Sequence, residues 1–161
     1  TPSARLSTIE RDQSVSLAQH RRTDIRTWSH HLHGELDWIT LKAMDNPYVN
    51  CIGHPTGRLI GQREAMDIDI DAVIKHAAQT QTAFEVNANP WRLDFKDIHC
   101  RMAIDAGVKL VIGTDAHSIA GLGLMGFGVA TAGRGWATKG DVLNTLSAAK
   151  IKSWVKSKRL R

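Results

Sequence analysis

The stretch Val111-Ile112-Gly113-Thr114-Asp115-Ala116-His117-Ser118 places an acid and a histidine two residues apart, directly after a short apolar run. The run predicts a buried strand, because β-branched residues suit positions that are packed on both sides. If the backbone stays extended beyond Thr114, the side chains of Asp115 and His117 leave the same edge of the strand, since side chains alternate along a strand. Such a pair can bind a metal ion or act as acid and base. The structural alternative is that Asp115 caps a helix and His117 lies on the surface.

Two further predicted strands upstream also end in polar residues. The strand over 48–52 is followed by His54, and the strand over 83–87 carries Glu85, with Asn87 and Asn89 alternating beyond it. Helices predicted between these strands make them parallel, and the carboxyl ends of parallel strands in an α/β barrel share the rim on which active sites lie. The sequence therefore predicts an α/β fold with three polar strand ends on one rim. The alternative is three unrelated polar turns.

Helix and turn signals divide the chain between these strands. A helix is predicted from about residue 35, and Asn46-Pro47 ends it. Alternating acids precede a second helix, and capping explains them better than a calcium loop, because the required Gly and Glu are absent. A third helix is predicted to begin with Asp94 as its cap and to end at Gly107.

The segment after Ser118 is rich in glycine. Residues 121–128 lack the order of a phosphate-binding loop and are predicted to form a flexible loop at the barrel mouth. Two helices, one over about 140–146 and one from Ala148, are predicted to close the chain.

Composition indicates an ordinary globular protein. The 161 residues suffice for one domain with a core, and 42% of them are hydrophobic and 23% charged. No apolar run is long enough to cross a membrane, and the first residues lack the apolar region of a secretory signal. Two cysteines far apart in the chain predict reduced thiols. We therefore expect a cytoplasmic protein with no membrane partner.

Positive charge gathers at the C-terminus. The net charge is +5, and the last dozen residues hold six cations and no acid. A basic patch of this kind can bind a polyanion without sequence specificity. The residues assigned to a nucleic-acid contact are Lys152, Lys156 and Lys158. The alternative is a solvated terminal helix.

Residues 1–34 show no steady apolar period and are predicted to be unorganised. They contain a histidine cluster, His30, His31 and His33, that lacks a nearby acid or cysteine in a recognisable metal-binding spacing. A domain boundary is therefore predicted near residue 35, and residues 35–161 form the organised part.

Three stretches carry a family resemblance. NPYVNCIGHPTGRLIG (46–61), FEVNANPWRLDFKDIHCRMAIDAGVKL (84–110) and VIGTDAHS (111–118) resemble, in this order, the polymerase and histidinol phosphatase (PHP) domain at the C-terminus of bacterial family X DNA polymerases. The tail over 128–146 is similar to that subgroup too. The resemblance implies a distorted (β/α)₇ barrel with up to three divalent metal ions. It also implies phosphoesterase activity, such as 3′–5′ exonuclease or phosphatase action on DNA ends.

The resemblance also assigns site residues. His54, Asp115 and His117 match metal ligands of the family. The residues that fall in the same signatures and would line a substrate or phosphate pocket are Arg58, Asn87, Asn89 and Arg92. Nitrogen and oxygen donors without thiolates favour Mn²⁺ or Zn²⁺, with Fe²⁺ as a further candidate, and such ions activate water for hydrolysis.

The family's opening H-x-H motif, its next histidine and its glutamate ligand have no counterpart in this sequence. A complete barrel needs about 200–250 residues, so the chain is interpreted as the C-terminal part of a PHP barrel. Our hypothesis is a truncated or frameshifted gene product with weak or no activity alone. Two alternatives remain: a non-catalytic remnant that binds nucleic acid, and a half-barrel completed by another chain.

Overall fold

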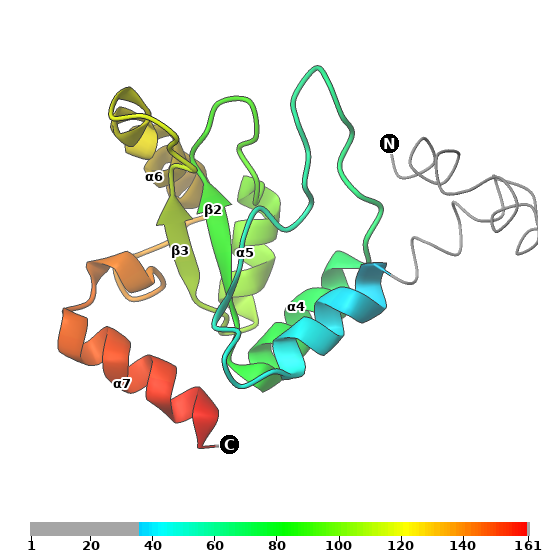
Figure 1. The fold of residues 1–161 in the computed structure, drawn as a ribbon, viewed down its shortest axis with the longest axis vertical. Helices are drawn as coiled ribbons and strands as arrows, with labels where there is room; N and C mark the ends of the chain where they lie inside the picture. The colour runs from blue at the N-terminus through cyan, green and yellow to red at the C-terminus, as the bar shows by residue number, and fades with distance from the viewer. Residues whose placement is uncertain (1–35, 161) are drawn as a thin grey trace, which may run out of the picture.

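A three-stranded parallel sheet organises residues 36–160, the part of the chain that the computed structural model describes (Figure 1). The strand order is β1-β2-β3, and the sheet is not closed within these residues. After a helix over 36–45, the elements are β1 (Cys51–Ile52), α4 (Ile70–Thr80), β2 (Ala83–Asn87), α5 (Asp97–Asp105), β3 (Leu110–Gly113), the 3₁₀ helix η1 (Ala120–Leu124), α6 (Met125–Arg134), the 3₁₀ helix η2 (Leu143–Thr145) and α7 (Ala148–Arg159). The predicted α/β class is confirmed, and an open sheet with covering helices is consistent with a partial barrel.

The strand register separates two faces of the sheet. Phe84 pairs with Leu110 and Val86 with Ile112, and all four side chains are buried in the hydrophobic core. Because side chains alternate, Glu85 and its partner Val111 point to the opposite face. The helices α5 and α6 pack against the strands, and α4 packs against α5. The apolar face therefore makes the core, and the polar residues are left for the other face and the strand ends.

Most of the predicted helix boundaries are confirmed. Asp69 caps α4 by accepting a hydrogen bond from the backbone N–H of Ala72 at 2.9 Å. Gly107 follows α5 with a φ of +78°, which is the left-handed conformation expected of a residue that ends a helix. The helix over 36–45 forms as predicted, and its buried residue is Met44.

The prediction for Asp94 is wrong. Lys96 occupies the N-cap position of α5, and the Asp94 side chain is fully buried. Its carboxylate accepts the backbone N–H of Thr56 at 3.0 Å. Asp94 therefore ties the loop after β1 to the loop after β2.

The prediction of a flexible glycine-rich loop is also wrong, because residues 120–134 form η1 and α6. A Cβ on Gly128 would lie 2.5 Å from Cγ2 of Ile112 and 2.9 Å from Cβ of Ala88. Glycine lets α6 approach the sheet this closely. Tertiary packing thus overrides the low helix propensity of glycine.

The C-terminal helix α7 borders a cavity beside the sheet. Its apolar side chains line this cavity of about 230 Å³ together with Cys51 of β1 and Val111 of β3. The other predicted closing helix is shorter than expected, because only residues 143–145 are helical as η2. Of the two helices predicted after residue 139, α7 is confirmed.

The place of Lys158 differs from that of the other two lysines assigned to a nucleic-acid contact. Lys158 is 5% exposed, and its ammonium group donates to the carbonyl of Val49 and, at 2.6 Å, to the hydroxyl of Thr82. Burial lowers its pKa. Lys158 therefore anchors α7 to the sheet, whereas Lys152 and Lys156 are exposed on the same helix.

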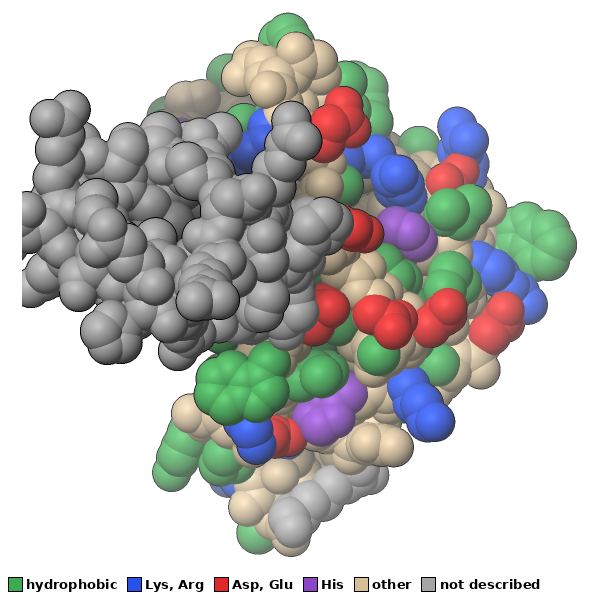
Figure 2. All heavy atoms as spheres, turned by 90° about the vertical axis from the view of Figure 1, so that its right-hand side faces the viewer, with side chains coloured by type: hydrophobic (Ala, Val, Ile, Leu, Met, Phe, Trp, Pro, Cys, Tyr) green, Lys and Arg blue, Asp and Glu red, His purple; other side chains and the backbone are tan. Residues whose placement is uncertain are grey.

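On the face drawn in Figure 2, several acidic side chains lie in a row across the middle, and lysine and arginine side chains lie above and below it. Among residues 36–160, no helix is long and apolar enough to cross a membrane. The predicted segment 1–34 and its histidine cluster lie outside the described residues.

Candidate metal and phosphate site

Glu85 fills the space between the ends of β1 and β3. Its Oε2 accepts the backbone N–H of His54 at 2.7 Å, directly after β1. A Cβ on Gly113, the last residue of β3, would lie 2.4 Å from Oε1 of Glu85. Gly113 thus makes room for the carboxylate that fixes the main chain at His54. The polar strand ends meet on one edge, as the parallel strands require.

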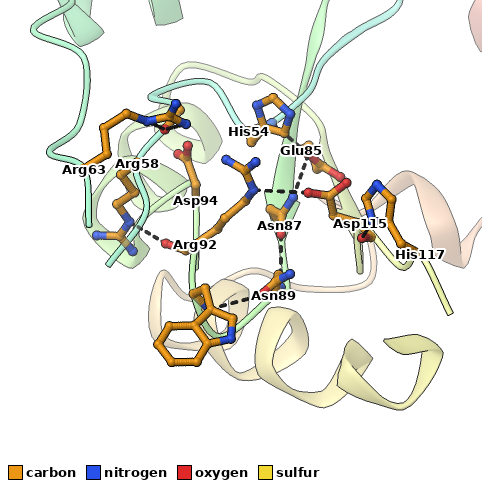
Figure 3. Close-up of polar contacts among 12 residues, drawn as sticks. His54, Arg58, Arg63, Glu85, Asn87, Asn89, Arg92, Asp94, Asp115 and His117 are labelled. Atoms are coloured by element: carbon orange, nitrogen blue, oxygen red, sulfur yellow. Dashed lines mark hydrogen bonds and ion pairs between the residues drawn. The ribbon is translucent and has the colours of Figure 1, made fainter. Parts of the chain in front are cut away.

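The backbone turns sharply at Asp115, so the expectation of an extended chain beyond Thr114 is wrong. Asp115 has a φ of +52°, a conformation that few non-glycine residues adopt. Its Oδ2 accepts a hydrogen bond from Nε of Arg92 at 3.1 Å, and both side chains are mostly buried. The two groups form an ion pair across the ends of β2 and β3 (Figure 3).

His117 turns back onto the same residue. Its Nδ1 lies 2.7 Å from the backbone carbonyl oxygen of Asp115. A carbonyl oxygen accepts only, so Nδ1 carries the proton and Nε2 holds the free lone pair. His117 is exposed, and this arrangement suits a histidine that binds a ligand through Nε2.

His54 is the third predicted ligand. Its φ is +28° and its side chain is exposed, and in Figure 3 its ring stands beside Glu85 while Asp115 and His117 lie together. The donors have the right chemistry for a hard or borderline cation. However, residues 36–160 bring no three His, Cys, Asp or Glu side chains into an arrangement that could hold a metal ion. By themselves they do not fit a metal site.

The thiol of Cys51 lies near Glu85 and differs from the other donors in its acidity. Burial, and then the negative charge of Glu85, raise the pKa of its thiol to about 12. A thiol of this pKa stays protonated at neutral pH, and the thiolate is the form that binds metals. The ligand chemistry of this edge therefore remains nitrogen and oxygen.

The two asparagines predicted to line the pocket make hydrogen bonds within the loop after β2. Asn87 is fully buried, and its Oδ1 accepts the backbone N–H of Asn89 at 3.0 Å. The Oδ1 of Asn89 accepts the backbone N–H of Trp91 at 3.0 Å. Both side-chain oxygens are therefore occupied in shaping the turn that carries Arg92.

The two arginines take different places. Arg92 faces Asp115, and its NH1 is buried without a hydrogen-bond partner among the described residues. Arg58 donates from Nε to the carbonyl of Arg92 at 2.6 Å and from NH2 to the carbonyl of Leu93. In Figure 3 its guanidinium lies on the far side of Asp94 from Asp115. Arg92 belongs to the strand-end site, and Arg58 braces the loop behind it.

Sequence reasoning missed the central role of Glu85. The alternation of Glu85, Asn87 and Asn89 had marked a polar edge that needs partners, but not which partners. The backbone N–H of His54 and the missing Cβ of Gly113 now supply them. The signal in the sequence was Gly113, a glycine that ends a buried strand next to the strand that carries Glu85.

Comparisons with known proteins give the site its context. The chain is 47% identical over 114 residues to the DNA polymerase/3′-5′ exonuclease PolX of Bacillus subtilis (strain 168), which covers 71% of this chain and 20% of that protein. It is 30% identical over 125 residues to probable phosphatases of Thermoanaerobacter sp. (strain X514) and Thermoanaerobacter pseudethanolicus, covering 74% of this chain and 48% of each of those proteins. No family model matches the chain.

The chain is part of a PHP domain. The resemblance predicted from the three stretches is thereby confirmed. The PHP portion spans about half the length of the probable phosphatases and a fifth of PolX. The strand-end site lies within the stretches that carried the resemblance, so relationship and geometry point to the same edge of the sheet.

Proposed function

We propose that this chain is a portion of a metal-dependent phosphoesterase of the PHP type, acting on a DNA end or another phosphate ester. The single observation that carries this is the convergence of Asp115, His117 and Arg92 at the carboxyl ends of β2 and β3. One carboxylate and one imidazole, both of which can bind metals, lie there with one guanidinium. They lie beside the turn at His54, whose backbone N–H is held by Glu85. The PolX of Bacillus subtilis and the probable phosphatases extend this to phosphate-ester hydrolysis.

In this proposal, His54, Asp115 and His117 would contribute donors to a Mn²⁺ or Zn²⁺ site that further donors complete, and the ion would supply activation of water. Arg92 holds Asp115 in place and offers its unpaired NH1 to a phosphate oxygen, since guanidinium and phosphate form strong charge-assisted hydrogen bonds. A buried donor without an acceptor costs about 1–3 kcal/mol, so an oxygen ligand there lowers the free energy of the site.

Because the described residues do not assemble three donors, we expect this chain to bind metal weakly and to hydrolyse slowly. A half-barrel completed by a second chain remains part of the proposal, since an open sheet edge favours association. The frameshift hypothesis for residues 1–34 is tested separately, by translating the encoding DNA in every frame and searching for the missing H-x-H motif.

Metal content and hydrolysis test the proposal together. Protein purified without a histidine tag is loaded with Mn²⁺, desalted and measured by elemental analysis, and its release of nucleotide from a labelled single-stranded DNA is followed. We expect a small metal content and slow release, both lost in Asp115→Ala and in His117→Ala. The matched control is Asp105→Ala, an exposed carboxylate that pairs with Arg101. Metal content and release that survive Asp115→Ala unchanged contradict the proposal.

A second candidate function is nucleic-acid binding without catalysis. The supporting observation is that Lys150, Lys152 and Lys156 are exposed on α7 and make no ion pair within residues 36–160. This reading predicts DNA binding that is sensitive to salt, unaffected by EDTA and unchanged by His117→Ala. Binding that disappears in EDTA would exclude it.

A further inference from the structure

A basic cavity lies behind the strand-end site. It has a volume of about 230 Å³ and opens between the loop after β1, the loop after β2 and the C-terminal end of α6. The residues that line it are Arg58, Leu93, Lys96, Asp97, Thr131 and Arg134. Three cations and a single carboxylate therefore share the space.

The single carboxylate is already paired. Oδ2 of Asp97 lies 2.8 Å from NH2 of Arg134, and Oδ1 of Asp97 accepts the backbone N–H of Ile98. Arg58 and Lys96 have no carboxylate within ion-pair distance in the described part of the chain. The cavity consequently has an excess of positive charge.

Arg58 is fixed before any ligand arrives. Its guanidinium donates to the carbonyls of Arg92 and Leu93, which holds its plane in one orientation. Its remaining N–H donors find no partner within residues 36–160. A preorganised guanidinium loses little side-chain entropy when it binds an oxyanion, and its fork suits phosphate.

His99 lies close to this cavity and is partly buried. Burial first, and then the charges of Lys96 and Arg58, lower the pKa of His99, against the opposing charges of Asp94 and Asp97. His99 therefore stays neutral near pH 7. The cavity keeps its cationic character without help from a histidine charge.

We propose that this cavity binds a phosphate group of a nucleic-acid strand, held by Arg58, Lys96 and Arg134. The phosphate chemistry follows from the cavity itself, and the choice of a nucleic acid rests on the proposed function. Arg92 joins the two places, because its carbonyl accepts from Arg58 while its Nε binds Asp115. In this proposal, a phosphate further along a strand whose end lies at Asp115 occupies the cavity.

The test is the binding of a fluorescein-labelled oligothymidylate, measured by fluorescence anisotropy in EDTA at several salt concentrations. EDTA keeps binding separate from hydrolysis, so failure of the proposed catalytic function does not change this result. The variant is Lys96→Gln with Arg134→Gln. The matched control is Lys75→Gln with Lys139→Gln, which removes the same charge from exposed positions outside both the cavity and α7.

We expect the cavity variant to weaken binding about tenfold and to lower the slope of log K against log salt by about 0.7, because the loss of one phosphate contact on a single strand removes about 0.7. The control stays within about twofold of the unaltered protein. Equal binding by the cavity variant overturns the proposal, and so does an equal loss in both variants. Circular dichroism checks the folding of the double variant, and the two single variants replace it if it unfolds.

Inorganic phosphate distinguishes the source of the phosphate group. Competition by millimolar phosphate in the unaltered protein, together with tight oligonucleotide binding, supports a strand. The contrary result has two parts: inorganic phosphate raises the melting temperature of the unaltered protein but not of the cavity variant, and no oligonucleotide binds. This result would contradict the binding of a strand and assign the cavity to a small phosphate ester.

Discussion

Replacing Gly113 by alanine tests the link between the two outer strand ends. The new Cβ would lie 2.4 Å from Oε1 of Glu85, and real contacts of this kind stay above about 3.0 Å. The φ of Gly113 is not positive, so crowding is the cost. Glu85 must then withdraw from the backbone N–H of His54, which it holds at 2.7 Å. A hydrogen bond to a charged group contributes about 1.5–3 kcal/mol, and overpacking costs about 1–3 kcal/mol.

We therefore expect Gly113→Ala to lower the free energy of unfolding by about 2 kcal/mol, measured by urea denaturation with circular dichroism. At roughly 2–4 °C per kcal/mol for a chain of this length, the melting temperature should fall by about 4–8 °C. Glu85→Ala removes the crowding, so the double variant should be no less stable than Glu85→Ala alone, with a coupling energy near 2 kcal/mol. Gly123→Ala is the control, because a Cβ there meets nothing within 4 Å. Additive losses in the double variant, or a loss no larger than in the control, would refute the reasoning.

Three more perturbations follow from the packing. Gly128→Ala should lower the free energy of unfolding by about 1–3 kcal/mol, because the new Cβ is crowded against the sheet. A Cβ on Gly126 of the same helix meets nothing within 4 Å, so Gly126→Ala should be neutral or slightly stabilising. Urea denaturation curves of the two variants measure the difference. Lys158→Met should lower the free energy of unfolding by about 1–3 kcal/mol, because the carbonyl of Val49 and the hydroxyl of Thr82 lose their donor. The same change at exposed Lys156 should alter it by no more than about 0.5 kcal/mol. Equal effects of the two variants would contradict the burial of Lys158. Burial raises the pKa of both cysteine thiols to about 12. Both thiols should therefore react slowly with a disulfide reagent at pH 8 in the native protein, and quickly in urea. Rapid reaction of the native protein would contradict the raised pKa of the thiols.

The regular elements could be predicted because their signals are local. The β-branched residues of β3 and the alternation of apolar and polar residues in β2 fix strands, and Asp69 and Gly107 mark helix ends by their own chemistry. Parallel connection then places the strand ends on one edge. The family, and the edge of the sheet that carries its residues, could be predicted for the same reason, because the three matching stretches are local in the sequence.

The remaining features depend on contacts distant in sequence. The partners of Lys158 lie 109 and 76 residues away, so no window around residue 158 contains the reason for its burial. The glycines of α6 weaken a helix locally and favour it only where the sheet lies beside them. The partner of the Asp115 carboxylate, Arg92, likewise lies 23 residues upstream.

The Arg92–Asp115 ion pair affects how strongly a cation can bind at this site. Arg92 binds Oδ2 of Asp115 through Nε, which neutralises the carboxylate within the fold and leaves Oδ1 as the oxygen open to a further ligand. A cation placed at Oδ1 would face the guanidinium across one carboxylate, so additional negative donors are needed to offset the repulsion between the two positive charges. The described residues bring no such group of donors to this place. A phosphate oxygen at the unpaired NH1 of Arg92 would supply negative charge at this point. Phosphate and metal would consequently strengthen each other's binding, and a chain given only one of the two should hold it weakly.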